Sequence, residues 1–224
     1  MKFDIDHSTP YFMEIFQNVS DDDMTGGSEA IKVISEYHKK NHYLLNTGAV
    51  GYDPPSWSEE DNVFPSDAPV HPMTHIHGFD HFQGLEQTSQ FIPDYAGWHE
   101  GAFCLNGPEY PQTYERVIED LSQWDNIGIV VEDVHKLTEP EAFEIGKICA
   151  VHIDVDIYEP TVSSLKFVDK CEWDKIYMRF DDWHGHEPDY DSHERLACKE
   201  WIEKNNYTFE LLRNGLHGEM IVSR

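Results

Sequence analysis

Basic residues are scarce in this sequence. Lysine and arginine together number 16 against 43 aspartate and glutamate residues, so the 224-residue chain carries a formal net charge of −27 at pH 7. A field of this sign repels nucleic-acid phosphates and anionic membrane surfaces. We therefore expect neither nucleic acid nor a membrane among the partners of the chain, and we interpret most of its acids as solvated surface.

Long apolar runs and closely spaced cysteines are also lacking. No stretch is apolar over the roughly 20 residues that a membrane-spanning helix needs, and "MKFDIDHSTPYF" lacks the basic start and apolar core of a signal peptide. A cytoplasmic location is therefore the expectation. The four cysteines contain no C-x-x-C spacing, so neither a zinc site nor a disulfide framework is indicated.

The length and the 39% hydrophobic content suit one α/β domain over residues 1–224. Apolar strand patterns alternate with segments of helical period, which predicts a mostly parallel sheet with helices on both faces and an antiparallel C-terminal edge. The expected strands include 127–131, 175–180, a short one ending near Asp80 and two closing the chain. Helices are expected after Ser28, over Tyr114–Leu121, around Val162, Leu165 and Val168, and over 192–205, with a short one in "EPEAFEIGK" that has Pro140 near its first turn. Residues 51–72, rich in Pro, Asp and Ser, are predicted to be an irregular insertion.

Two pairs of aspartates stand where strands are predicted to end. In "AVHIDVDIYEPT" the apolar residues Ile153, Val155 and Ile157 indicate a strand, with Asp154 and Asp156 alternating between them. In "RFDDWHGH" Asp181 and Asp182 end the next strand. Ligands of an open parallel sheet bind beyond the carboxyl ends of its strands, so these acids are expected to meet at one edge.

Clustered carboxylates repel one another, and a hard divalent cation such as Mg²⁺ or Mn²⁺ relieves that repulsion. The alternative is that these acids cap helices or pair with Lys175 and Arg179. Two pairs at successive strand ends favour the metal. The histidines of "HPMTHIHGFDH" and the loop residues His184 and His186 are weaker candidates, since no cysteine or acid spacing accompanies them.

"HIDVDIYEPTVSSL" followed by "FDDW" resembles the metal-dependent class I O-methyltransferases of the macrocin type, which act on sugars of antibiotics and related glycans. The resemblance implies a Rossmann-like methyltransferase fold and the cofactor S-adenosylmethionine. It also implies that Asp154, Asp181 and Asp182 hold the metal, with Asp156 as the candidate general base. The acids of the first pair, Asp154 and Asp156, are thus the catalytic candidates.

"HGFDHFQGLEQ" resembles the segment of that family where a strand ends in an acid near the cofactor ribose, which implies that Asp80 binds the ribose hydroxyls. "MTGGSEAI" resembles its glycine-rich turn, which puts Gly26, Gly27 and Ser28 near the methionine carboxylate. "VVEDVHKL" falls where its loop meets the adenine, so Glu132 and Asp133 are expected contacts. The Glu-x-Gly opening of the family's first strand is missing from "FQNVSDDDMTGGS".

The function that follows is Mg²⁺-dependent transfer of a methyl group to a hydroxyl of a sugar or glycosylated small molecule. We expect residues 1–25 and the 51–72 insertion to close over the site, and the resemblance implies a homo-oligomer. Two alternatives stay open. One is a catechol-type methyltransferase, since Trp98, Tyr158 and Trp183 suit an aromatic ring or a sugar face. The other is a non-catalytic metal- or glycan-binding protein of the same fold.

Overall fold

A computed structural model describes about half of the chain in detail. The described residues are 12–18, 74–90, 99–104, 115, 119, 127–183, 191, 193–215 and 217–224. Among them, no helix is long and apolar enough to cross a membrane. Everything stated below concerns these residues.

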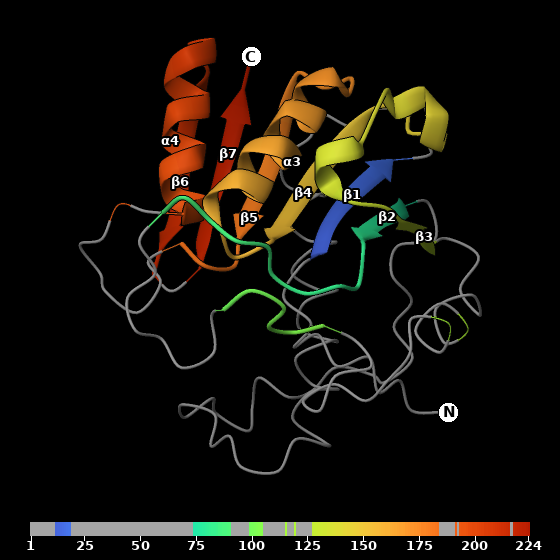
Figure 1. The fold of residues 1–224 in the computed structure, drawn as a ribbon. Helices are drawn as coiled ribbons and strands as arrows, with labels where there is room; N and C mark the ends of the chain where they lie inside the picture. The colour runs from blue at the N-terminus through green and yellow to red at the C-terminus, as the bar shows by residue number, and fades with distance from the viewer. Residues whose placement is uncertain are drawn as a thin grey trace, which may run out of the picture.

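The described residues form a seven-stranded sheet with two α-helices whose bounds are described, α3 and α4 (Figure 1). The strand order is β3-β2-β1-β4-β5-β7-β6. The strands are β1 (Phe12–Asn18), β2 (Thr74–Asp80), β3 (Ile127–Val131), β4 (Ile148–Asp154), β5 (Lys175–Phe180), β6 (Thr208–Asn214) and β7 (Gly218–Ser223).

Five of the seven strands run in the same direction. The pairs β2–β3 and β4–β5 are parallel, whereas β7 is antiparallel to both β5 and β6, and β1 is antiparallel to both β2 and β4. The antiparallel closing strands confirm the sequence prediction. The direction of β1 departs from the expected parallel interior of the sheet: its last residue, Asn18, pairs with Thr74 at the beginning of β2.

Both α-helices follow strands of this common direction. Helix α3 (Tyr158–Lys170) connects β4 to its neighbour β5, and α4 (His193–Asn205) connects β5 to β6. Because crossovers between strands of one direction are almost always right-handed and both connections move the same way along the sheet, the two helices cover the same face. Figure 1 shows them side by side in front of the sheet. Helices on the other face stay a prediction.

The core lies between these helices and the sheet. Its members are buried apolar residues of β4, β5, β7 and both helices, including Ile153, Phe180, Leu165, Cys198 and Met220. Aromatic rings also pack in this layer. The ring centroid of Trp173 lies 6.0 Å from that of Trp201 and 5.2 Å from that of Tyr207. Burial of these apolar side chains stabilises the packing of the helices on the sheet, and it thereby fixes the position of the strand ends relative to the first turns of the helices.

Most elements expected in the described region are confirmed. The predicted strands 127–131 and 175–180 match β3 and β5 residue for residue. The short helix expected around Pro140 is a 3₁₀ turn, η3 (Pro140–Phe143), preceded by another, η2 (Val134–Lys136). Of the expected helix Tyr114–Leu121 only Glu115 and Glu119 are described, and both are helical. The helix after Ser28 and the 51–72 insertion lie outside the described residues.

One strand prediction is wrong at its end. Strand β4 stops at Asp154, so Asp156 is not the second inward-facing residue of one strand. It lies instead in the turn before α3, where its backbone φ is +58°. Ile153, Val155 and Ile157 are all buried, each with 0% exposed. Their alternation with the aspartates therefore reflects burial, and it continues beyond the strand into a turn.

Candidate functional site

Three aspartates meet at the carboxyl ends of β4 and β5. One carboxylate oxygen each of Asp154, Asp156 and Asp182 lies within 4.8 Å of the other two. Asp154 is the last residue of β4, and Asp182 is the second residue after β5. The parallel pairing of these strands brings their ends to the same edge, as the sequence predicted.

Asp156 reaches this cluster because of its backbone turn. Its side chain is buried, with 2% exposed, and its left-handed φ turns the chain from β4 toward α3. Aspartate tolerates this conformation better than most residues with a side chain. Its Oδ2 atom has no hydrogen-bond partner in the described structure. Burial raises the pKa of Asp156 well above its ordinary value, and the nearby charges of Asp182 and Asp154 add to the rise.

Asp182, like Asp156, is an acid with a raised pKa. The pKa of Asp182 is raised to about 6. Burial is the largest cause; a hydrogen bond with Asp156 acts to lower the pKa, and the charge of Asp181 acts to raise it. A hydrogen bond between two carboxyl groups requires a proton on one of them. The cluster therefore holds either a proton or another cation near neutral pH, because unscreened carboxylates this close do not all ionise.

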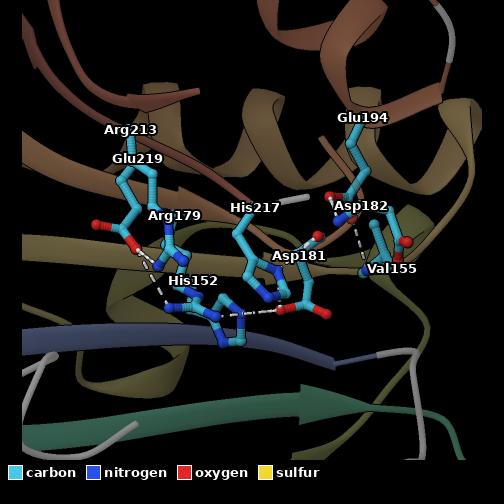
Figure 2. A network of polar contacts seen from close by, with 9 residues as sticks. All are labelled: His152, Val155, Arg179, Asp181, Asp182, Glu194, Arg213, His217 and Glu219. Carbon is cyan, nitrogen blue, oxygen red and sulfur yellow. Dashed lines mark hydrogen bonds and ion pairs between the residues drawn. The ribbon is translucent and has the colours of Figure 1, made fainter. Parts of the chain in front are cut away.

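The structure does not bring Asp181 into this cluster. Its carboxylate Oδ1 lies 3.0 Å from Nδ1 of His217, 3.5 Å from Nη2 of Arg179 and 3.8 Å from Nε2 of His152 (Figure 2). Burial raises its pKa, but the contacts with His152 and His217 outweigh burial and leave the pKa well below the ordinary value. Asp181 is thus an ionised carboxylate held by Arg179 and two histidines, and its role as a metal ligand stays a prediction.

The contacts of Asp181 continue across the sheet. Arg179, with only 7% of its side chain exposed, also reaches Glu219 at 3.4 Å, and Glu219 in turn contacts Arg213 at 3.2 Å. These residues come from β5, β7 and β6, and Figure 2 shows them in one line of polar contacts. The sequence alternative that paired the acids with Arg179 therefore holds for Asp181.

Glu194 was missed by the sequence reasoning. Its side chain is fully buried in the first turn of α4, and its two carboxylate oxygens accept backbone hydrogen bonds from Val155 and Asp182 (Figure 2). The available signal was a glutamate on the helix after the Asp181–Asp182 pair. That signal is weak, because acids in the first turn of a helix are common on surfaces.

Asp80 marks a second part of the same sheet edge. It is the last residue of β2, its side chain is 2% exposed, and Oδ1 accepts the backbone N–H of Phe82 at 2.7 Å. Burial raises its pKa to about 8, against the lowering effect of the Phe82 and His81 amides. Phe79 and Asp154 pair with Met13 and Phe12 of β1, so Asp80 and Asp154 flank the beginning of that strand.

Glu132 and Asp133 lie beside Asp80 at the end of β3. The backbone N–H of Glu132 donates to the carbonyl of Asp80 at 3.2 Å, which joins the two strand ends. The carboxylate of Asp133 accepts the N–H of His135 and so caps η2. The structure thus brings together three of the residues expected at the cofactor, while any contact with a cofactor stays a prediction.

Other candidates are placed differently or fall outside the description. Trp183 is 5% exposed and packs against Phe180 at 5.4 Å between ring centroids, so it is unsuited to stack on a substrate. The hydroxyl of Tyr158 donates to Glu200. The candidates outside the described residues are Gly26, Gly27, Ser28, Trp98, His184 and His186. The lid predicted over residues 1–25 is wrong for residues 12–18, which form β1 between β2 and β4 and so belong to the sheet; residues 1–11 and 19–25 lie outside the described residues.

Comparison with known proteins gives partial structural likenesses. No protein-family model and no curated protein sequence matches the chain. Among solved structures, the O-methyltransferase NovP has a TM-score of 0.45 at 21% identity, covering 65% of this chain and 58% of its own. The calicheamicin methyltransferase CalS11 has a TM-score of 0.46 at 21% identity, with 68% and 61% covered. The S-adenosylmethionine-dependent methyltransferase SibL has a TM-score of 0.38 at 14% identity, with 69% and 45% covered. This chain therefore spans less than two thirds of each of them.

Proposed function

We propose that the chain is a Mg²⁺-dependent O-methyltransferase that transfers a methyl group from S-adenosylmethionine to a hydroxyl of a sugar or glycosylated small molecule. The observation that carries the proposal is the gathering of Asp154, Asp156 and Asp182 at the edge that also holds the buried acid Asp80. The motifs around these residues are the ones that resemble macrocin-type enzymes.

The residues of the cluster fit a hard divalent cation. Mg²⁺ and Mn²⁺ prefer oxygen ligands, and each of the three residues offers a carboxylate. Oδ2 of Asp156 is buried without a hydrogen-bond partner in the described structure, and a buried acceptor of this kind is costly unless something binds it. Burial is the main cause of the raised pKa values of Asp156 and Asp182, and neighbouring carboxylate charges add to it; a bound cation would offset both effects.

Asp80 fits the ribose of the cofactor. Its position at the end of β2 follows the rule that ligands of such sheets bind beyond the carboxyl ends of the strands. A carboxylate there can accept hydrogen bonds from two vicinal hydroxyls. Glu132 and Asp133 lie next to Asp80, so the adenosine end of the cofactor would lie over the ends of β2 and β3.

The proposed chemistry divides the acids by task. Asp154 and Asp182 would hold the cation, and Asp156 would accept the proton of the reacting hydroxyl. A bound Mg²⁺ would hold two neighbouring oxygens of the acceptor and acidify one of them. The strand ends would fix the donor over β2 and the acceptor over β4 and β5, so that positioning supplies much of the rate.

The test is methyl transfer from labelled S-adenosylmethionine to a panel of sugar nucleotides, glycosides and catechols, with Mg²⁺ and with EDTA. We expect transfer to a sugar hydroxyl only when Mg²⁺ is present. Asp154→Asn should abolish it, whereas Asp174→Asn should not, because Asp174 is an exposed acid at the opposite end of β5. Full activity in EDTA would overturn the metal assignment.

Calorimetry with S-adenosylmethionine separates this proposal from a non-catalytic role. An enzyme should bind the cofactor at micromolar concentration, and loss of that binding in Asp80→Ala would support the ribose assignment. A protein that binds Mn²⁺ or a glycan but shows no heat with S-adenosylmethionine would be the non-catalytic alternative. Transfer to catechols in preference to sugars would favour the catechol-type alternative.

A further inference from the structure

Glu194 joins the two loops that carry the acidic cluster. Its Oε1 accepts the backbone N–H of Val155 at 3.0 Å, and its Oε2 accepts the backbone N–H of Asp182 at 3.0 Å. The side chain is 0% exposed. Figure 2 shows Glu194 reaching from α4 to both loops at once. One carboxylate thus bridges the ends of β4 and β5.

The two amides that Glu194 binds are next to the cluster itself. Val155 stands between Asp154 and Asp156, and the other amide belongs to Asp182. A shift of either loop would therefore change the separation of carboxylates that now lie within 4.8 Å. Mg²⁺ demands near-ideal octahedral geometry, so the spacing of its carboxylates matters more than their number alone.

The burial of Glu194 has a cost that packing does not explain. The residue is 0% exposed, and its carboxylate lies against the backbone of Asp182, a member of the acidic cluster. Helix α4 already packs through apolar side chains, including Ala197, Cys198 and Trp201, without needing this acid. A buried carboxylate beside three others is unfavourable for stability alone.

We propose that Glu194 is a positioning residue that sets the distance between the Asp154–Asp156 loop and the Asp182 loop, so that Asp154 and Asp182 can hold a divalent cation with Asp156 beside it. This inference rests on the proposed function for its metal. It adds a residue from a third element, α4, that touches neither substrate nor metal and acts through the backbone of the two loops.

Glu194→Gln is the informative substitution. It keeps the shape of the side chain but replaces one acceptor oxygen with an NH₂ group, so only one of the two amides keeps its acceptor. Loss of such an outer partner typically weakens metal affinity about 10–100-fold. We expect this loss in the Mn²⁺ dissociation constant of the full chain, measured by electron paramagnetic resonance with Mn²⁺ alone.

Glu203→Gln is the matched control, because Glu203 lies on the exposed side of the same helix. It should leave Mn²⁺ affinity unchanged. Glu194→Asp is the second variant: it keeps the charge but is one methylene shorter, and so it should also weaken Mn²⁺ binding. Amide exchange at Val155 and Asp182 should be faster in both Glu194 variants.

The outcomes separate this inference from the proposed function. If the unmodified chain binds Mn²⁺ and both Glu194 variants bind it equally well, the positioning role is overturned. A purely structural role predicts that result together with a lower melting temperature. If the unmodified chain binds no Mn²⁺, the metal step of the proposed function fails, and the positioning role falls with it. Weaker binding in both variants, with Glu203→Gln unchanged, supports the inference.

Discussion

Nδ1 of His217 lies 2.8 Å from the main-chain carbonyl oxygen of Asp181 and 3.0 Å from its carboxylate Oδ1. One ring nitrogen from the turn between β6 and β7 therefore contacts both the backbone and the side chain at the end of β5. This contact orients Asp181 toward the histidines, while its neighbour Asp182 lies in the acidic cluster. The two adjacent aspartates consequently have different surroundings and different pKa directions.

The first prediction separates these two aspartates. Asp182→Asn should weaken Mn²⁺ binding about 10–100-fold, the equivalent of the 1.5–3 kcal/mol of one lost charged contact. Asp181→Asn should weaken it less, because His217 and Arg179 hold that carboxylate away from the cluster. Mn²⁺ titration of both variants gives the comparison, with Asp174→Asn as the exposed control. An equal or greater loss in Asp181→Asn would show that Asp181 turns to the cation, as the motif resemblance implies.

The second prediction concerns the base. Asp156→Asn preserves the shape of the side chain and removes its proton acceptor. It should lower kcat by about 10²–10⁴, the usual contribution of a general base, while S-adenosylmethionine and Mn²⁺ still bind. Turnover, calorimetry and Mn²⁺ affinity on this one variant test the division of tasks. A collapse of Mn²⁺ affinity along with turnover would make Asp156 a ligand instead.

The third prediction is a pH dependence of cofactor binding. Because burial raises the pKa of Asp80 to about 8, the carboxyl is largely protonated at pH 6–7. If its ionised form accepts the ribose hydroxyls, binding below pH 8 must release a proton. The affinity for S-adenosylmethionine should then rise by about tenfold per pH unit between pH 6 and 7.5 and level off above pH 8. Calorimetry across this range measures it, and Asp80→Asn should show a flat, weaker profile.

The fourth prediction tests the packing of Trp183, the residue after Asp182, against Gly218. A Cβ added at Gly218 would lie 2.3 Å from Cδ2 of Trp183, whose indole N–H donates to Asn214 at 3.0 Å. Gly218→Ala should therefore lower the free energy of unfolding by about 1–3 kcal/mol, as overpacking usually does. Urea denaturation measures the change. Gly215→Ala is the control, because a Cβ there would meet no atom within 4 Å. Equal stability of both variants would contradict this packing.

Much of the architecture was present in local sequence patterns. Short apolar runs are enough to specify β3 and β5, because a buried strand needs little more than such a run between polar turns. The same patterns indicate that the acids of "HIDVDIYEPT" and "RFDDW" follow neighbouring strands. Since parallel strands end at the same edge, the sequence also predicts that carboxylates meet there, which the structure confirms for three of the four.

The sequence alone did not determine how the four acids divide. Asp181 and Asp182 are adjacent and identical, and their difference comes from Arg179 on the strand that precedes them, together with His152 of β4 and His217 of the turn before β7, which only folding brings to Asp181. Asp156 enters the cluster through a left-handed turn, although its alternation with apolar residues indicates a strand. Alternating apolar residues show which side chains are buried, and the same alternation of buried side chains can occur in a strand or in a turn.

The direction of β1 and the contacts of Glu194 depend on the tertiary structure. Both arise from pairings between residues far apart in sequence: Phe12 lies opposite Asp154, and Glu194 accepts a hydrogen bond from Val155, 39 residues earlier. Side-chain periodicity is determined by the geometry of one segment, so sequence patterns indicated most of the described strands and helices and the edge where acids gather. Strand direction and backbone-to-carboxylate hydrogen bonds depend on which segments meet once the core has formed, so only the folded chain decides them.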